Sequence, residues 1–280
     1  MTRDSEPILR KRGRPRGTST TLNDDRGGVR ALDRALDLLD LLAQGQGLTL
    51  SEIAARMKLA PSTVHRVLTT LAARNVVESD PLTQAWYVGP TAFRHGMAFM
   101  RRSGLIDRSR PLLRRLMEFT GETANLGIRN GDAVLFIGQA ETHETIRAFF
   151  PPGTRSPLHS SGIGKALLAY AAPDALRSFM REAELTRFTE LTLTEPEALV
   201  KDLAAIRQRG YSIDNEERTI GMRCIAAPVF DMLGEAVAGI SVSGPVHRMT
   251  DARIAAYGEE IVRAARELSL SDGFSGQGAG

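Results

Sequence analysis

The hydrophobic and polar positions of residues 29–74 follow the spacing of three helices. In residues 29–43 the apolar positions form one stripe, namely Leu32, Ala35, Leu36, Leu39 and Leu42. Thr49 and Glu52 have the spacing of a capping box, which predicts a second helix that ends at about Lys58. Pro61 suits the first turn of a third helix, which is predicted to end at about Arg74. Two short helices joined by a three- or four-residue turn are typical of a helix-turn-helix.

The third predicted helix places its apolar and polar residues on opposite faces. The residues expected to point inward are Val64, Val67, Leu68 and Leu71. The residues expected to point outward are Ser62, Thr63, His65, Arg66 and Thr69. Short side chains let a helix enter the major groove of double-stranded DNA, where Arg and His reach base edges or phosphates. The sequence therefore predicts that these five outward residues contact a DNA operator.

Residues 75–79 and 85–89 read as two short strands around the turn sequence DPLTQ. A hairpin directly after a recognition helix is a wing, so residues 29–89 are predicted to form a winged helix-turn-helix domain. Trp86 allows two interpretations, a DNA-contacting aromatic or a core residue that holds the hairpin against the helices. The core role is the commoner one and is the one expected here.

Beyond the hairpin, residues 90–104 are predicted to form a linker helix with a break near Ser103 and Gly104. Residues 105–270 then alternate strand and helix patterns. The expected strands are 123–129, 133–140, 145–150, 223–230 and 235–244. The expected helices are 105–120, 162–171, 196–210 and 250–270. This order predicts an α/β (α+β) effector-type domain, in which helices flank a sheet.

Composition narrows the class of protein. The chain has 280 residues, 42% hydrophobic and 25% charged, which is ordinary for a globular protein of two domains. No apolar run approaches the ~18 residues of a membrane span. The single cysteine, Cys224, excludes an internal disulfide and fits a reducing compartment. A cytoplasmic protein with no membrane partner is therefore expected.

The net charge of +3 is concentrated in residues 1–28, which hold seven basic and four acidic residues. Within this predicted disordered tail, RKRGRPR (10–16) has five basic residues and no acid. It is either a solubilising leader or an arm that follows DNA phosphates, and GRPRG is similar to the core of an AT-hook. Residues 271–280 are predicted to be a second disordered tail.

The stretch HSSGIGKALLAY (159–170) joins a glycine-rich turn to an apolar helical run. It does not fit a Walker phosphate loop, because His159 replaces the first glycine and Ala166 replaces the hydroxyl residue after Lys165. Backbone N–H groups at a helix start still suit a small anion. Lys165 is expected to lie on the helix face and not to bind phosphate.

Three stretches in this order resemble the IclR family of bacterial transcription regulators. They are ALDRALDLLDLLA…LTLSEIAARMKLAPSTVHRVLTTL, LHSSGIGKALLA, and IRQRGYSIDNEERTIGMRCIAAPVFD…VAGISVSGP. The resemblance covers about residues 29–270. It implies an N-terminal winged helix-turn-helix and a C-terminal effector-binding domain similar to GAF domains. It also implies a homodimer or homotetramer that binds operators and responds to a small carboxylate.

Residues 121–128, 141–169 and 241–245 are most similar to the glyoxylate-responsive branch of this family. The family's effector pocket maps onto six residues: Gly162, Ile163, Asp214, Cys224, Ser241 and Ser243. The N–H groups and hydroxyls suit a carboxylate, whereas Asp214 repels one unless the ligand supplies a donor, as the gem-diol of hydrated glyoxylate does. Positions corresponding to apolar walls are small or polar here (Thr145, Ala148 and Ser156), which leaves pyruvate or an aromatic acid as alternative effectors.

The residue types also raise the possibility of a catalytic site or a metal site. His159, Cys224 and Asp214 are the residue types of a catalytic set, but Cys224 lies in an apolar strand where a packing thiol is expected. His65 and His95 have no second His or Cys nearby at the spacing that metal ligands require. No catalytic residue, metal or cofactor is therefore expected. A binding module whose helix-turn-helix no longer binds DNA, or contacts proteins instead, is the remaining alternative.

Overall fold

The computed structural model describes residues 29–45, 47–102 and 104–270. The chain divides into two compact units, the first ending at Met97 and the second beginning at Ala98. The predicted tails 1–28, with RKRGRPR, and 271–280 lie outside the described residues. Within the described ranges, no helix is both long and apolar enough to cross a membrane.

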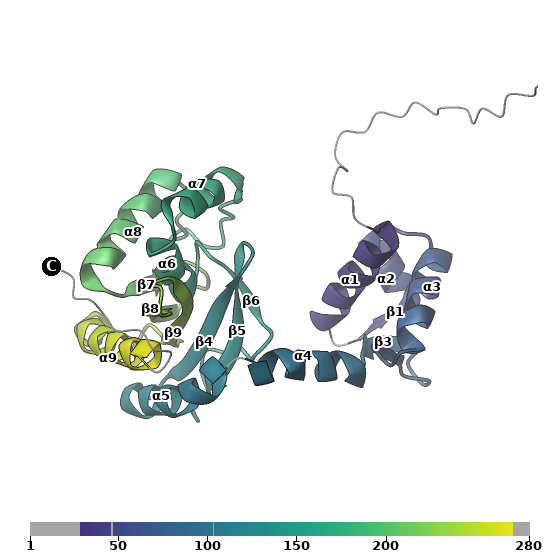
Figure 1. Ribbon diagram of the computed structural model, residues 1–280, viewed down its shortest axis with the longest axis horizontal. Coiled ribbons are helices and arrows are strands. Elements are labelled where there is room, and N and C mark those ends of the chain that lie inside the picture. Colours follow the sequence, from purple (N-terminus) through teal and green to yellow (C-terminus); the bar gives the residue numbers. More distant parts are fainter. Residues whose placement is uncertain (1–28, 46, 103, 271–280) are drawn as a thin grey trace, which may run out of the picture. The chain divides into compact units, whose positions relative to one another are not determined.

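The first unit combines short helices with a small antiparallel sheet of strand order β1-β3-β2 (Figure 1). Its elements are α1 (Arg30–Ala43), β1 (Leu48–Thr49), α2 (Leu50–Met57), α3 (Pro61–Ala72), β2 (Val77–Ser79), β3 (Ala85–Val88) and α4 (Pro90–Arg102). The helix α4 contains the division between the units.

Local sequence signals determine where the two helices of the helix-turn-helix begin and end. Thr49 and Glu52 form the predicted capping box, in which the Glu52 carboxylate accepts from the Thr49 N–H at 2.8 Å and the Thr49 hydroxyl accepts from the Glu52 N–H. Lys58 ends α2 in the left-handed region, with φ of 53°, and Pro61 begins α3. The predictions of both helices are confirmed, although α3 ends two residues earlier than expected.

The predicted helix over residues 29–43 is confirmed as α1, but only the second half of its apolar stripe is buried. Leu38 and Leu42 are the buried residues of this helix, whereas the side chains of Leu32 and Leu36 are 57% and 52% exposed. The core cluster under α1 is built by residues of α2, α3 and the sheet, and it contains neither Leu32 nor Leu36. Helical spacing identified an apolar face, but the core of this unit is too small to cover its whole length.

The wing has the predicted hairpin and one additional strand. Strand β3 pairs with both β2 and β1, so that Trp86 lies opposite Ser79 on one side and Leu48 on the other. Trp86 is half-buried and packs against the core cluster of this unit. Its side chain therefore holds the hairpin to the helices, as the core interpretation predicts.

The second unit is a six-stranded antiparallel sheet with helices on both faces (Figure 1). Its elements are α5 (Gly104–Thr120), β4 (Thr123–Asn130), β5 (Ala133–Ala140), β6 (Arg155–Pro157), α6 (Gly162–Ala169), α7 (Pro173–Glu182), α8 (Pro196–Arg209), β7 (Ser212–Asn215), β8 (Met222–Phe230), β9 (Ala236–Pro245) and α9 (Asp251–Leu270). The strand order is β6-β5-β4-β9-β8-β7.

The two faces of the sheet differ in character because side chains alternate along each strand. On one face Ala238, Ile240 and Val242 of β9 join the core formed with α5 and α9. On the other face β9 presents Gly239, Ser241 and Ser243, and α6 with α8 covers this side. The face covered by α6 and α8 therefore places polar side chains of β9 beneath the start of α6.

The predicted strand 145–150 is wrong. These residues form a loop whose Ile146 carbonyl accepts from the Arg248 guanidinium at 2.7 Å, and Pro151 and Pro152 follow it. The third strand of this region is β6, which pairs with residues 133–135 of β5. The helix α7 and the strand β7 were not predicted. After the two prolines the chain turns at Gly153, with φ of 98°, and the residues from Gly153 onward take the place beside β5.

Candidate functional site

The outer face of α3 presents the residues predicted to contact DNA. Ser62, His65, Arg66 and Thr69 are exposed and Thr63 is half-buried, whereas Val64 and Leu68 are fully buried beneath them. The Thr69 hydroxyl donates to the His65 carbonyl, and the Thr70 hydroxyl donates to the Arg66 carbonyl. The long side chains of His65 and Arg66 thus stand on a face of short polar residues, which suits a major groove.

In the second unit, α6 begins against the polar face of the sheet. Ser161 caps the helix, with its hydroxyl accepting from the Gly164 N–H at 3.1 Å. A Cβ at Gly162 would lie 2.7 Å from Cys224 Sγ, and a Cβ at Gly164 would lie 2.2 Å from the Leu158 carbonyl oxygen. Only glycine permits this approach. In the described part of the chain, the N–H groups of Gly162 and Ile163 have no carbonyl partner.

Register brings three of the predicted effector residues side by side. Asp214 of β7 lies opposite Cys224 of β8, and Cys224 lies opposite Ser243 of β9. The three side chains form a row across neighbouring strands, directly beneath the start of α6. A carboxyl, a thiol and a hydroxyl therefore face the free end of a helix dipole.

A small cavity of about 30 Å³ lies at this junction. Five of the six predicted effector residues line it, namely Gly162, Ile163, Asp214, Cys224 and Ser243. Its other walls are Phe136, Phe150, Ser156, Ser161, Arg218, Thr219, Met222 and Arg223. One ordered water needs roughly 10–15 Å³ measured in the same way, so the cavity admits only a molecule of a few atoms.

The sixth residue, Ser241, lies two positions along β9 and does not line the cavity. Its hydroxyl is fully buried, and no nitrogen or oxygen of the described residues forms a hydrogen bond with it. Of the three positions expected to build a wall, Ser156 does so. Ala148 is buried elsewhere and Thr145 is exposed.

Burial determines the protonation states of Asp214 and Cys224 in this row. It raises the pKa of Asp214 to about 7, and the neighbouring charge of Glu217 adds to the effect. Burial also raises the pKa of the Cys224 thiol to about 12, with a contribution from Asp214. Near neutral pH the Cys224 thiol is thus uncharged, and Asp214 exchanges its proton in the same range.

Arg218 and Arg223 are the charged cavity residues that the sequence did not predict. The Arg218 guanidinium lies 3.8 Å from the centre of the Phe188 ring. Phe136 and Phe150 were missed as well, and their rings stack at 5.0 Å between centres on one wall. In the sequence, Arg218 stands in the NEERTIGMR stretch, four residues after Asp214. This position indicates a role in the cavity only when the structure shows that the stretch lines it.

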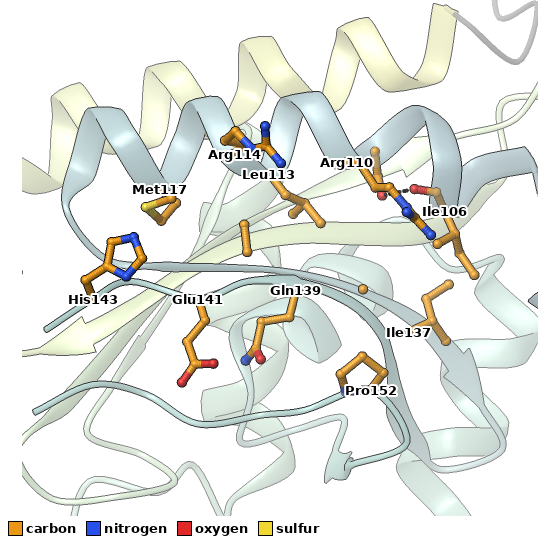
Figure 2. A pocket seen from close by; sticks show the side chains of 13 residues that line it. Ile106, Arg110, Leu113, Arg114, Met117, Ile137, Gln139, Glu141, His143 and Pro152 are labelled. Carbon is orange, nitrogen blue, oxygen red and sulfur yellow. Dashed lines mark hydrogen bonds between the residues drawn. The ribbon is translucent and has the colours of Figure 1, made fainter. Parts of the chain in front are cut away.

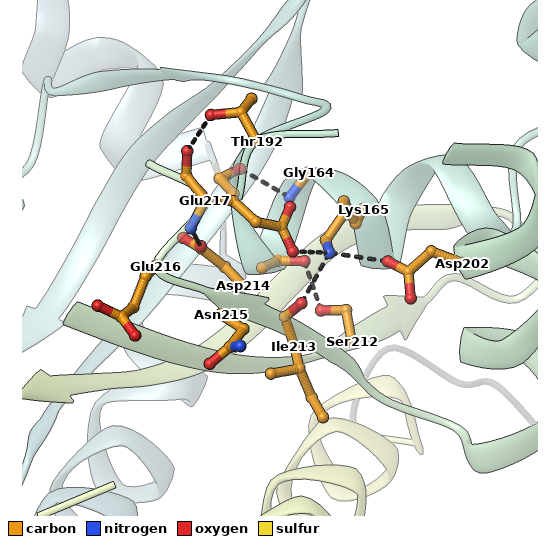
Figure 3. Close-up of polar contacts among 12 residues, drawn as sticks. Gly164, Lys165, Thr192, Asp202, Ser212, Ile213, Asp214, Asn215, Glu216 and Glu217 are labelled. Carbon is orange, nitrogen blue, oxygen red and sulfur yellow. Dashed lines mark hydrogen bonds and ion pairs between the residues drawn. The ribbon is translucent and has the colours of Figure 1, made fainter. Parts of the chain in front are cut away.

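Lys165 lies on the helix α6, as expected, but on a buried face of it. Its side chain is 1% exposed, and its Nζ donates to Asp202 Oδ2 at 2.7 Å, to Glu217 Oε1 at 2.5 Å and to the Ile213 carbonyl at 2.7 Å (Figure 3). Burial lowers the pKa of Lys165, but the charges of Glu217 and Asp202 outweigh it and the net shift is upward. All three donors of the ammonium are satisfied within the protein, which leaves none for a phosphate.

His159 does not complete a catalytic set with Cys224 and Asp214. Its Nε2 lies 3.0 Å from the Thr186 carbonyl, its ring stacks with Phe188, and it lines a separate pocket. The Cys224 thiol has a neighbouring carboxyl but no imidazole among the residues that line its cavity.

A wider groove of about 520 Å³ runs between α5 and β5 (Figure 2). Ile106, Leu113 and Ile137 form its floor, and Arg110, Arg114, Glu141 and His143 stand at its rim. None of the residues predicted from the sequence lies there.

A winged helix-turn-helix followed by a sheet domain with a small polar cavity defines a ligand-responsive, DNA-binding transcriptional regulator. The chain belongs to the IclR family. Residues 31–81 match the IclR helix-turn-helix domain, and residues 97–270 match the C-terminal domain of bacterial transcriptional regulator IclR. The family and the fold class expected from the sequence are confirmed.

Two relatives and one solved structure illustrate the similarity. The chain is 72% identical to the HTH-type transcriptional regulator BhcR of Paracoccus denitrificans, over 94% of both chains. It is 37% identical to the transcriptional repressor IclR of Escherichia coli, over 95% of this chain and 98% of that one. The crystal structure of Thermotoga maritima IclR superposes with a TM-score of 0.69 at 30% identity, over 88% of this chain and 99% of that one. These relatives are regulators of transcription, and the chain is one as well rather than an enzyme.

Proposed function

We propose that the cavity at the start of α6 binds a small 2-oxoacid, with glyoxylate as the preferred effector, and that its occupancy changes operator binding by residues 29–89. The observation that carries the proposal is the convergence of the Gly162 and Ile163 N–H groups, which have no backbone carbonyl partner among the described residues, with Asp214, Cys224 and Ser243 on one small cavity. The helix start favours a carboxylate, and the row of polar groups suits the oxygen atoms at the other end of the molecule.

Size and charge favour glyoxylate over the alternatives. A cavity of about 30 Å³ suits two carbon atoms with their oxygens and excludes an aromatic ring in this conformation. Pyruvate places a methyl group where hydrated glyoxylate places hydrogen-bonding hydroxyls. Buried polar groups such as Asp214 would then have no hydrogen-bond partner. The similarity of residues 141–169 to the glyoxylate-responsive branch points to the same effector.

Replacing Arg218 by alanine is expected to weaken glyoxylate binding by about 1.5–3 kcal/mol, because a charge-assisted hydrogen bond to the carboxylate is lost. Calorimetry on the full chain measures this effect. Arg177→Ala is the matched control, since Arg177 is an exposed arginine of α7 that pairs with Asp174. Equal affinities of the wild type and Arg218→Ala for glyoxylate would show that Arg218 does not contribute to effector binding.

The DNA-binding surface is proposed to act as part of a homodimer or homotetramer on a pseudo-palindromic operator. Ser62, Thr63, His65, Arg66 and Thr69 are the proposed contacts. The exposed apolar residues of the first unit support self-association, because large apolar side chains left open on a monomer mark contact surfaces. They include Val29, Leu32 and Leu36 of the α1 region and Phe93 of α4.

Arg66→Ala is expected to weaken binding to the operator by about 1–3 kcal/mol if the guanidinium contacts a base edge. A mobility shift on the promoter region of the protein's own gene tests it, with Arg177→Ala as the control for a lost surface charge. A helix-turn-helix that no longer binds DNA would give no shift for the wild type, and an unchanged affinity of Arg66→Ala would remove Arg66 from the interface.

A further inference from the structure

The cluster around Lys165 lies just outside the cavity and shares the residues that hold Asp214. Lys165 of α6 connects α8, through Asp202, with the turn after β7, through Glu217 (Figure 3). Glu217 in turn donates its backbone N–H to Asp214 Oδ1 at 2.9 Å. One chain of contacts therefore runs from a buried ammonium to the carboxyl that lines the cavity.

Glu217 is fixed at several points. Its side chain is 7% exposed, one carboxylate oxygen is held by Lys165, and its backbone carbonyl accepts from the Thr192 hydroxyl at 2.6 Å. Its second oxygen, Oε2, is buried and forms no hydrogen bond with the described residues. The negative charge of Glu217 is thus held close to Asp214 and is only partly satisfied.

The charged and titratable groups that face Asp214 come from several elements around it. They are Lys165 from α6, Glu217 and Arg218 from the turn, and Cys224 from β8, whose thiol is neutral. The Lys165 ammonium is bound to Glu217 and Asp202, and Arg223 is bound to Asn215 and Asp251. An effector carboxylate adds one more negative charge, and two carboxylates in one buried site share a proton.

We propose that Glu217 and Lys165 are positioning residues of the effector site: Lys165 anchors Glu217, and Glu217 holds the Asp214 carboxyl toward the cavity in its protonated form, so that an anionic effector enters together with one proton. The proposal rests on the proposed effector function. The proton comes from solvent and binds to Asp214, which then donates a hydrogen bond to the effector instead of repelling it. The raised pKa of Asp214, about 7, places this exchange near neutral pH.

The test is calorimetry of sodium glyoxylate binding to the full chain between pH 6 and pH 9, in phosphate and in Tris. The two buffers differ in ionisation enthalpy, so the difference in measured heat gives the protons taken up. The wild type is expected to take up close to one proton at pH 8. Its affinity is expected to fall up to tenfold per pH unit above pH 7, because the protonated fraction of Asp214 falls tenfold per unit there.

Glu217→Gln keeps the backbone N–H to Asp214 and an oxygen for Lys165 but removes the charge. The fall in affinity is expected to begin at a lower pH in this variant. Glu216→Gln removes the same charge one residue away, where the carboxylate accepts from the Gly221 N–H, and is expected to keep the wild-type pH profile. Asp214→Asn is expected to bind without proton uptake, with no dependence on pH in this range.

The outcomes separate the two proposals. Glyoxylate binding by the wild type without proton uptake overturns the inference alone. A Glu217→Gln variant that is weakened equally at every pH assigns Glu217 a purely structural role and also overturns it. If the wild type binds neither glyoxylate nor pyruvate, the proposed effector function itself is wrong, and the inference fails with it.

Discussion

Lys165→Met is expected to lower the free energy of unfolding of the second unit by about 3–5 kcal/mol, because it leaves the buried Glu217 carboxylate without a cation and Asp202 with only its more distant partner Arg209. Glu217 is 6% exposed, and the Asp202 side chain is 22% exposed with the more distant Arg209 as its other partner at 3.4 Å. Lys201→Met is the matched control, since Lys201 is exposed on α8, and its effect is expected to stay within about 0.5 kcal/mol.

Urea unfolding followed by circular dichroism measures the loss, and Trp86 provides an internal reference. It is the only tryptophan and lies in the first unit, so its fluorescence is expected to report a transition that Lys165→Met leaves in place. The triple variant Lys165→Met, Asp202→Asn, Glu217→Gln removes all three charges and is expected to recover part of the loss. A Lys165→Met protein as stable as Lys201→Met would show that the cluster contributes nothing.

Asp214→Asn is expected to stabilise the protein at pH 8 by up to about 4 kcal/mol and to have little effect at pH 4. The pKa of Asp214 is about 7 in the folded chain against an ordinary 3.8. Between these values the folded state binds more protons than the unfolded state, so the free energy of unfolding falls as pH rises. The upper limit follows from a shift of about three pH units at about 1.4 kcal/mol each. An Asn side chain cannot ionise, and its oxygen can still accept from the Glu217 N–H.

The measurement is the free energy of unfolding of the wild type, Asp214→Asn and Asp174→Asn at several pH values from 4 to 8. Asp174 is an exposed aspartate of α7 and controls for the loss of a surface charge. The curves of the wild type and Asp214→Asn are expected to separate as pH rises, while that of Asp174→Asn runs parallel to the wild type. Curves that stay together up to pH 8 would show that Asp214 is ionised in the folded protein without penalty.

Local signals in the sequence were sufficient for the helix-turn-helix. The capping box at Thr49 and Pro61 at the start of α3 act within one turn of the chain, so they can be read from spacing alone. The exposure of Leu32 and Leu36 could not be read in this way, because it depends on how far the small core of the first unit extends.

The candidate effector site needed the tertiary structure. Asp214 and Cys224 are ten residues apart, and their pairing depends on β7, a short strand that carries no clear alternation. The spacing of residues around Lys165 does not predict that its side chain is buried, because its partners lie 37 and 52 residues further along the chain. The resemblance to the family supplied most of the residues, and the fold added Arg218 and the cluster around Lys165.

Titration of the operator-bound protein with glyoxylate tests the central claim most directly, with calorimetric binding to the same preparation read alongside. Glyoxylate is expected to bind more tightly than pyruvate and to change operator affinity, and ATP is expected to do neither. Arg218→Ala is expected to shift the glyoxylate response to higher concentration while leaving operator binding without effector intact. A protein that ignores glyoxylate, or one that binds ATP in a manner abolished by Lys165→Ala, would contradict the assignment of this cavity as a 2-oxoacid site.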